Sequence, residues 1–275
     1  MRDRLVRTVK RHRTLHRTAR KARVAVGHLL PPREFPGIPG RIHFNDFMFG
    51  GGSAEEIASY AERANNVIAA LGATLSAAGK AFDDVERWLD FGCGYGRVVR
   101  FLVQRVPRER ISVCDVVTEG VDFCASEFGV RPIHAPTDLR TLELGSFDLI
   151  YAISVITHLN ERNSIALLRL LGDSLTEGGI AMFTTHGRYS LENPALYGAE
   201  YEERRAEIAD AVERRGTAFL PYPFLSGDDY GMAWHSREFI ERTMEELHEG
   251  RMRLLVFTER GLDDHQDIFA FQRVL

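Results

Sequence analysis

The sequence predicts an α/β fold built around a parallel sheet, with helices on both faces of the sheet. From residue 85 onward, short apolar segments alternate with segments of helical period, which is typical of strands joined by crossover helices. A glycine-rich turn joins the first strand to a helix. Two strand-like segments separated by a short turn end the chain and indicate an antiparallel hairpin, so we expect seven strands with the last one reversed.

The chain before residue 85 contains a basic arm, a proline-rich linker and one long helix. Leu5, Val9 and Leu15 recur at helical intervals and indicate an Arg-rich helix within residues 1–30. The segment PPREFPGIPG follows and contains four prolines and two glycines, which predicts a linker or an irregular arm. Ser53 then precedes two glutamates and an alanine-rich stretch, so we expect a capped helix at 53–79.

The alternating region contains five predicted strands, at 86–90, 110–115, 131–134, 147–153 and 179–185. Helices between them are expected at about 97–105, 118–128 and 161–176. The alternation then ends, and the remaining expected elements are a charged helix at 200–215, an aromatic, proline-containing loop at 219–234, a helix at 236–248 capped by Ser236, a strand at 251–258, a turn around Gly261 and a strand at 267–273.

We expect two parts in the chain: residues 1–40 as arm and linker, and residues 41–275 as one domain. A chain of 275 residues is long enough to bury one large core. The segment at about 188–235 interrupts the alternation of strands and helices. We therefore expect it to be an insert that caps the sheet.

Composition indicates a protein of the reducing cytosol. The three cysteines form no C-x-x-C pair, and their odd number argues against a disulfide framework. No uncharged apolar run approaches the roughly 20 residues needed to cross a bilayer, and the basic N-terminus lacks the apolar core of a signal peptide. We expect no metal site.

Charge is distributed unevenly along the chain. Residues 1–33 contain 11 Arg and Lys against one acid, which gives about +10, so the remainder carries about −14 within a total of −4. The result is a basic arm attached to an acidic body.

The segment WLDFGCGYGRVVRFL carries the clearest functional signal. A buried strand ends in the acid Asp90, and Gly92, Gly94 and Gly96 follow at every second position before a helix begins. Such a turn lets backbone N–H groups approach a polar ligand at a helix N-terminus. A dinucleotide fingerprint would need its third glycine at position 97, which is Arg97, so the spacing is D-x-G-x-G-x-G instead.

This spacing resembles motif I of the class I S-adenosylmethionine-dependent methyltransferases. The resemblance implies a doubly wound, Rossmann-like sheet, S-adenosylmethionine as cofactor and S-adenosylhomocysteine as product. It also implies that Asp90 holds the ammonium of the methionine moiety, while Gly92, Gly94 and Gly96 make room for it.

The second predicted strand ends in Asp115, an acid positioned to accept hydrogen bonds from both hydroxyls of a ribose. The alternative is an ordinary negative charge at a helix N-terminus. The family resemblance adds further cofactor contacts: Val116, Thr137, Asp138 and Leu139 around the adenine, and Ile153 and Ser154 at the tip of the fourth strand, under the sulfonium.

Three histidines are candidates for the base that a hydroxyl acceptor requires. Topology places His186, His235 and His265 on the face outside the carboxyl ends of the strands, where ligands bind in such sheets. Their unperturbed pKa of about 6.5 suits a base near neutrality. The alternative is a structural or surface role for each of them. His158 also follows a strand, but a histidine at this place in the family usually packs locally.

Other motifs restrict the acceptor. The tip of the fourth strand lacks the N/D-P-P-Y/F pattern of exocyclic-amine methylation, and no cysteine occupies a catalytic loop position. The aromatic and acidic residues of 219–234 suit stacking and hydrogen bonding to a sugar-like or aromatic acceptor, or else a cap that packs its aromatics onto the core.

The resemblance covers roughly residues 85–275 and includes DFGCGYGR, the long insert, W-H-S before the last helix and the terminal HQD. These features resemble a bacterial methyltransferase branch that often accompanies polysaccharide or cell-surface glycan synthesis. We therefore expect methyl transfer to a hydroxyl of a sugar, a glycan or another small molecule. The alternatives are a natural-product O-methyltransferase, and an RNA-binding methyltransferase or binding module that uses the basic arm.

The acidic body disfavours a nucleic-acid interface, which normally presents basic surface. Residues 1–30 instead suit an anionic membrane surface or a contact between subunits. We expect a cytoplasmic protein. Binding to the inner face of the membrane is one hypothesis for the arm, and the alternatives are a contact between subunits and a dispensable tail.

Overall fold

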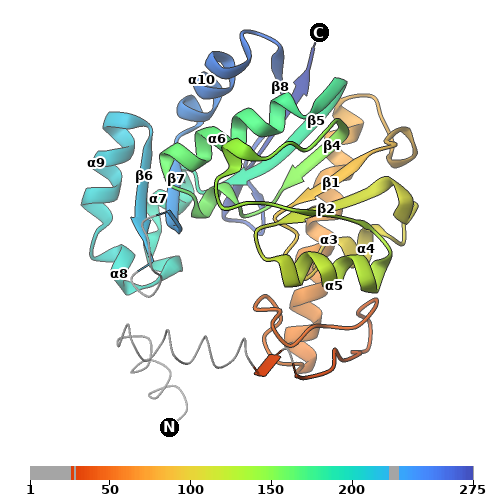
Figure 1. Ribbon diagram of the computed structural model, residues 1–275. Helices are drawn as coiled ribbons and strands as arrows, with labels where there is room; N and C mark the ends of the chain where they lie inside the picture. Colours follow the sequence, from red (N-terminus) through yellow and green to blue (C-terminus); the bar gives the residue numbers. More distant parts are fainter. Residues whose placement is uncertain (1–25, 28, 223–228, 275) are drawn as a thin grey trace.

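The computed structural model describes residues 26–27, 29–222 and 229–274. Its centre is a seven-stranded sheet in the order β3-β2-β1-β4-β5-β9-β8 (Figure 1). The predicted helix of the basic arm lies almost entirely outside the described residues. The strands of the sheet are β1 (Trp88–Phe91), β2 (Ile111–Asp115), β3 (Arg131–His134), β4 (Phe147–Ala152), β5 (Leu175–Thr185), β8 (Met252–Leu262) and β9 (Gln266–Arg273).

The strand directions confirm the predicted fold class. β1 to β5 run parallel to one another, while β9 is antiparallel to both of its neighbours, β5 and β8. The order of the sheet reverses between β1 and β4, because the chain builds outward from β1 to β3 and then returns to the other side of β1. In such sheets ligands bind outside the carboxyl ends of the strands at this reversal.

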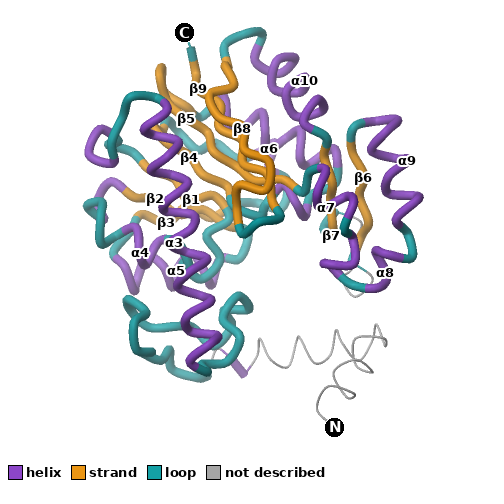
Figure 2. The backbone as a smooth tube through the Cα atoms, turned by 180° about the vertical axis from the view of Figure 1, so that it is seen from behind, coloured by secondary structure: helices purple, strands orange, loops and turns teal. Residues whose placement is uncertain are grey.

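Helices cover both faces of the sheet, as predicted (Figures 1 and 2). One face carries α3, α4 and α5, and the opposite face carries α6 and α10. Their bounds are α3 (Ala54–Ala77), α4 (Val99–Leu102), α5 (Thr118–Phe128), α6 (Glu161–Asp173) and α10 (Arg237–His248). Short 3₁₀ turns occur at η1 (Phe82–Asp84), η2 (Arg108–Arg110), η3 (Leu139–Thr141) and η4 (Ile156–His158).

Each central strand is buried on both sides, which explains why it appears in the sequence as a continuous apolar run. In β4, Leu149 and Tyr151 belong to the core beneath α3, while Ile150 and Ala152 belong to the core beneath α6 and α10. Fully burying an aliphatic side chain of this size contributes about 1.5–3 kcal/mol. No helix among the described residues has the length and apolarity that a membrane span requires.

The insert has its own small core, separate from the cores of the main sheet. Tyr201, Ile208 and Trp234 are buried in it. Its elements are α7 (Arg188–Glu192), η5 (Pro194–Tyr197), α8 (Ala199–Glu202), α9 (Arg205–Arg215), β6 (Thr217–Pro221) and β7 (Gly231–His235).

Two predictions in the insert are wrong. Both ends of the expected loop at 219–234 instead belong to the antiparallel strands β6 and β7, which pair from Thr217 with His235 to Pro221 with Gly231. A Cβ on Gly231 would lie 2.1 Å from the Leu220 carbonyl oxygen, so the glycine that resembles a loop signal instead permits close pairing. The expected helix at 200–215 is broken at Arg204, which leaves the helical conformation (φ −104°, ψ 12°).

Further boundaries differ from expectation, and β5 begins at Leu175 instead of 179. The helix expected at 97–105 is a single turn, because the N–H groups of Gln104 and Arg105 bond three residues back rather than four, and Pro107 follows. The strand expected at 251–258 continues to Leu262 through a register shift, so the turn lies at 263–265 instead of around Gly261. An irregularity of this kind leaves little trace in sequence periodicity.

Candidate active site

The glycine turn after β1 borders open space at one position and packs tightly at the other two. All three glycines have a positive φ. A Cβ on Gly94 would meet nothing within 4 Å. A Cβ on Gly92 would lie 2.3 Å from Val155, and one on Gly96 would lie 2.8 Å from Phe128. Gly92 and Gly96 are therefore required by packing, and Gly94 faces a cradle that a ligand can fill.

Asp115 ties the glycine turn to the end of β2. Its carboxylate accepts hydrogen bonds from the N–H of Gly94 at 2.8 Å and of Val117 at 2.9 Å. Burial raises the pKa of Asp115, and these backbone donors oppose that shift. An ionised carboxylate offers about four acceptor positions, so two remain for a pair of ligand hydroxyls. Val116 beside it is 53% exposed, which leaves an apolar surface next to the acid.

Asp90 lies at the end of β1 with only 4% of its surface exposed. Burial raises its pKa to about 7, the hydroxyl of Tyr151 lowers it, and the charge of Asp115 raises it. A buried carboxylate with this pKa becomes ionised when a cation approaches it. The position therefore suits a ligand ammonium group.

The loop after β3 offers a ligand fewer free hydrogen-bond acceptors than the predicted adenine contacts require. Asp138 caps η3, and its carboxylate accepts a hydrogen bond from Arg140 Nε at 2.7 Å. The hydrogen bonding and charge of Arg140 lower the pKa of Asp138 to about 2. Thr137 is exposed and Leu139 is buried. An adenine amine would therefore share Asp138 with Arg140.

The tip of β4 has a strained backbone at Ser154, and hydrogen bonds of this residue link β4 to β5 and β9. Ser154 follows Ile153 and has a φ of 57°, which is uncommon for a residue other than glycine. Its N–H donates to Thr184 Oγ1 at 2.8 Å, and its hydroxyl donates to Gln266 Oε1 at 3.1 Å. Gln266 of the terminal HQD motif, at the start of β9, therefore fixes the tip of β4.

Two histidines at the ends of β4 and β5 are held by one strand of the insert. His158 Nδ1 lies 2.9 Å from the Gly231 carbonyl oxygen, and His186 Nδ1 lies 3.0 Å from that of Ala233. A carbonyl can only accept, so each neutral ring carries its proton on Nδ1 and its lone pair on Nε2. The Tyr222 hydroxyl, 3.0 Å from His158 Nδ1, then accepts from the same N–H. Burial lowers the pKa of both rings. Both are therefore neutral bases near pH 7.

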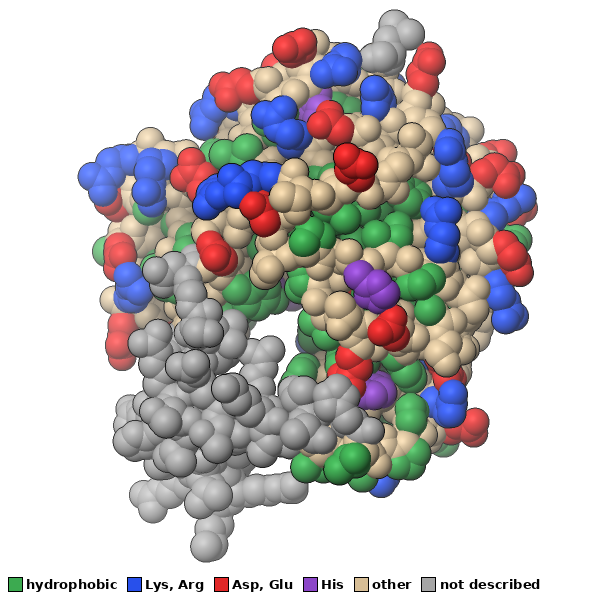
Figure 3. Space-filling model, viewed as in Figure 1, with side chains coloured by type: hydrophobic (Ala, Val, Ile, Leu, Met, Phe, Trp, Pro, Cys, Tyr) green, Lys and Arg blue, Asp and Glu red, His purple; other side chains and the backbone are tan. Residues whose placement is uncertain are grey.

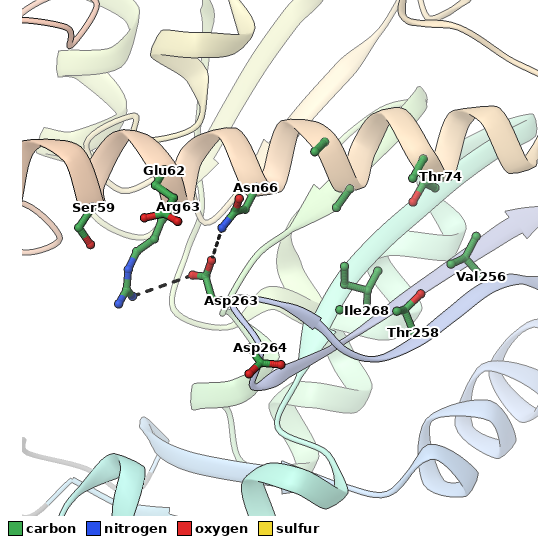
Figure 4. Close-up of a pocket in the computed structure, with 14 residues that line it drawn as sticks. Ser59, Glu62, Arg63, Asn66, Thr74, Val256, Thr258, Asp263, Asp264 and Ile268 are labelled. Atoms are coloured by element: carbon green, nitrogen blue, oxygen red, sulfur yellow. Dashed lines mark hydrogen bonds and ion pairs between the residues drawn. The ribbon is translucent and has the colours of Figure 1, made fainter.

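His265 joins this pair from the turn between β8 and β9. Its ring centroid lies 6.4 Å from that of His186, and its Nδ1 lies 2.9 Å from the Asp263 carbonyl oxygen. The Asp263 side chain accepts a hydrogen bond from Asn66 Nδ2 at 2.9 Å and faces Arg63 at 4.0 Å (Figure 4). Helix α3 thus fixes the turn that carries His265, beside a groove of about 740 Å³.

His235 does not join the cluster. Its Nδ1 lies 2.8 Å from Thr217 Oγ1 and its Nε2 lies 3.3 Å from Ser164 Oγ, so both ring nitrogens are engaged. Its ring stacks on Phe239, and burial lowers its pKa to about 4. The structure therefore brings together two of the three predicted bases, and adds His158, for which local packing was expected.

Aromatic side chains of the insert surround the histidine cluster. The Tyr197 ring lies 4.5 Å from that of His186, and Tyr222 and Tyr230 lie 5.8 Å and 5.2 Å from His158. Between the insert and the main sheet the molecular surface is hollowed, with hydrophobic side chains around the hollow (Figure 3). Tyr222 and Tyr230 belong to the segment expected to contact an acceptor, 219–234, whereas Tyr197 comes from η5.

The segment before α3 also reaches the glycine turn, which the sequence did not reveal. The ring of His43 stacks on Tyr95 at 4.8 Å. The Tyr95 hydroxyl donates to Glu119 Oε2 at 2.5 Å, and Asn45 Nδ2 donates to the same oxygen at 2.9 Å. The closely spaced aromatic residues of HFNDFMF were the available signal. Among the described residues, no group of His, Cys, Asp and Glu is arranged to hold a metal ion.

Comparisons with known proteins agree with this geometry. Residues 60–247 match the family described as methyltransferase domain. The N-terminal domain of EvdMO1, solved with S-adenosylhomocysteine bound, is 18% identical, with a TM-score of 0.52 over 94% of this chain and 97% of that one. A S-adenosylmethionine-dependent methyltransferase from Clostridium acetobutylicum is 14% identical, with a TM-score of 0.50 over 78% and 92%.

The magnesium protoporphyrin IX methyltransferase of Synechocystis PCC 6803 is 14% identical, with a TM-score of 0.50 over 82% of this chain and 91% of that one. At this level of identity these structures share the fold. No curated protein matches the chain. The family match covers more than half of the sequence and includes the glycine turn, Asp115 and the tip of β4. The chain belongs to the methyltransferase domain family.

Proposed function

We propose that this protein transfers a methyl group from S-adenosylmethionine to a hydroxyl of a sugar, a glycan or another small molecule, with His186 as the base. The observation that carries the proposal is the state of His186 at the end of β5. Its Nδ1–H is held by the Ala233 carbonyl, while Nε2 makes no hydrogen bond within the described part of the chain. An oriented, neutral imidazole is what proton removal from a hydroxyl requires.

The glycine turn and its surroundings fit the cofactor. Bound S-adenosylmethionine supplies an electrophilic methyl group on a sulfonium. The open space at Gly94 accommodates its methionine portion, and the buried Asp90 compensates the ammonium. The two remaining acceptor positions of Asp115 suit the ribose hydroxyls, and the exposed Val116 suits the adenine face.

The insert supports proton removal by His186. Burial keeps the ring neutral at pH 7, so its Nε2 lone pair is available to the acceptor hydroxyl. When Nε2 takes the proton, the hydrogen bond from Nδ1 to the Ala233 carbonyl stabilises the resulting cation. His158 and His265 flank His186 and present their Nε2 atoms as further acceptors for hydroxyl groups.

The side chains around His186 favour a neutral acceptor rich in hydroxyls. Tyr197, Tyr222 and Tyr230 offer flat apolar faces with polar edges, which suit a sugar ring as well as an aromatic ring. A glycan and a phenolic natural product share this chemistry. Both acceptor classes belong in the same test.

The experiment is a transfer assay with radiolabelled S-adenosylmethionine against sugars, lipid-linked glycans, phenols and RNA. We expect label on a hydroxyl-bearing acceptor, with the methyl group located as an ether by mass spectrometry. His235→Gln serves as the matched control for His186→Gln, since both histidines are buried near the insert. Label on RNA, or on a nitrogen of the product, would contradict the proposal.

We also propose that the basic arm places the protein at an anionic membrane surface on the cytoplasmic side. The support is the charge distribution, with about +10 within residues 1–33 and about −14 in the remainder. Basic residues near anionic lipid are each worth about 1 kcal/mol. A glycan acceptor carried on a membrane lipid makes such a location useful.

A further inference from the structure

Arg100, on α4, is completely buried, and its guanidinium bonds to the backbone at four places. Nε donates to the Gly96 carbonyl at 3.1 Å, and Nη2 donates to that of Tyr95 at 3.1 Å. Nη1 donates to the carbonyls of Pro39 at 3.0 Å and Arg41 at 3.1 Å. The first two acceptors belong to the glycine turn and the last two to the segment before α3. One side chain therefore joins these two parts of the chain.

A buried guanidinium is costly unless its donors are satisfied. Arg100 meets this cost with carbonyl oxygens and with two aromatic faces, those of Tyr60 at 5.6 Å and Phe128 at 5.1 Å from its central carbon. Its donors are arranged in a rigid, planar fork, whereas a lysine has one ammonium group on a flexible stem. Lysine cannot reach all four carbonyls at once.

The bonds of Arg100 help to fix how the glycine turn presents its backbone. In a trans peptide the carbonyl and the N–H point in opposite directions. With the carbonyls of Tyr95 and Gly96 held on Arg100, the N–H groups of Gly96 and Arg97 are turned away from it. Backbone bonds hold the same two peptide planes, since the Gly96 N–H donates to the Cys93 carbonyl at 2.9 Å and the Gly96 carbonyl accepts from the Arg100 N–H at 3.2 Å. The Arg100 side chain adds to these the bonds that tie the planes to the segment before α3.

The segment that Arg100 holds continues across the turn. After Arg41, His43 stacks on Tyr95. Asn45 bonds to Glu119 at the start of α5 at 2.9 Å, and Asp46 accepts a hydrogen bond from Tyr60 on α3 at 2.7 Å. These contacts anchor residues 38–49, here called the N-terminal strap, on three elements around the glycine turn.

We propose that Arg100 is a positioning residue for the cofactor, which holds the glycine turn and the N-terminal strap together as one wall of the binding site. The inference rests on the cofactor of the proposed function. Arg100 itself contacts no ligand, because it is buried under the turn. Replacement of Arg100 makes both the glycine turn and the N-terminal strap more mobile, and so weakens cofactor binding without removing a direct contact.

Arg273 provides a matched control. Its Nη1 also donates to three backbone carbonyls, those of Gly172 and Asp173 at 3.4 Å and Leu175 at 2.8 Å. Gly172 and Asp173 end α6 and Leu175 begins β5, so this clamp lies at the opposite ends of the parallel strands from the glycine turn. Arg273→Lys removes the same kind of backbone clamp without touching the cofactor region.

The test is titration with S-adenosylhomocysteine of the full chain, its Arg100→Lys and Arg100→Met variants and Arg273→Lys, with melting temperatures measured in parallel. We expect Arg100→Lys to bind at least about tenfold more weakly, the scale of one hydrogen bond to a charged group. Arg273→Lys should lower the melting temperature and leave affinity unchanged. Hydrogen exchange of Arg100→Lys should rise in residues 38–49 and 92–97, even without ligand.

The inference would be overturned if Arg100→Lys and Arg273→Lys showed the same loss of affinity together with the same loss in melting temperature. Wild-type affinity in Arg100→Lys would overturn it as well, while leaving the proposed function intact. Failure of the wild-type protein to bind S-adenosylhomocysteine would overturn both proposals.

Discussion

The rings of His158 and His186 stand perpendicular to one another, at 89°, with their centroids 6.4 Å apart. One strand of the insert, β7, holds both rings through the carbonyls of Gly231 and Ala233, which are two residues apart. Carbonyls at alternate positions of a strand point to the same side. The insert therefore does more than cover the sheet, because it determines which nitrogen of each histidine carries the proton.

Asp115→Asn should weaken S-adenosylhomocysteine binding by about 1.5–3 kcal/mol, the scale of hydrogen bonds to a charged group. Asp148→Asn is the matched control, since that carboxylate also accepts backbone N–H groups, from Glu86 at 3.2 Å and Arg87 at 2.9 Å, but at the opposite ends of the strands. Calorimetry measures both. Equal affinity losses in the two variants would show that Asp115 does not bind the cofactor.

Cofactor binding near pH 6 should release a proton from Asp90. Burial raises the pKa of Asp90 to about 7, so the carboxyl is largely protonated at pH 6 in the free protein. An ammonium group beside it favours the ionised form and expels the proton. Calorimetry in buffers of different ionisation enthalpy measures this release, which Asp90→Asn should abolish. Binding without proton release in the wild type would place the ammonium elsewhere.

The stability of the fold should decrease as the pH falls from about 6.5 to about 4, partly through His235. Burial lowers its folded pKa to about 4, below the unfolded value of about 6.5, so the unfolded state binds more protons within this window. The shift corresponds to about 3 kcal/mol. Denaturant unfolding of His235→Asn should show a shallower pH dependence than the wild type. An unchanged slope would show that His235 is not buried as described.

The basic arm should bind vesicles that contain anionic lipid, and binding should weaken as salt is added. Co-sedimentation measures this. Deletion of residues 1–30 should abolish binding, while S-adenosylhomocysteine affinity persists. Equal sedimentation of the truncated protein would leave the arm as a contact between subunits or as a dispensable tail.

Much of the fold was predictable because its signals are local. The central strands are continuous apolar runs, and a short polar turn separates the two terminal strands, so a parallel sheet that ends in an antiparallel hairpin was predictable. The insertion of β9 between β5 and β8 was not predicted. The paired strands of the insert were missed because Pro221 and Gly231, which usually mark loops, lie at the ends of β6 and β7.

The site was predictable in part for the same reason. Asp90 and the glycines occupy a compact motif, and Asp115 ends the next strand, which the structure brings against the turn. The roles of His158 and His235 depend on which partners their ring nitrogens meet. Those partners lie 73 residues away for His158, at Gly231, and 71 residues away for His235, at Ser164. Sequence spacing carries no information on such contacts.

The most direct test of the account is the rate of methyl transfer by His186→Gln compared with wild type and His235→Gln, on the hydroxyl acceptor found in the transfer assay. Wild-type turnover should fall on the acid side, below about pH 6.5, because burial lowers the pKa of His186 and only the neutral ring removes a proton. His186→Gln should reduce turnover by about 10²–10⁴ with S-adenosylhomocysteine affinity unchanged, while His235→Gln retains turnover. Wild-type turnover in His186→Gln would contradict the assignment of His186 as the base.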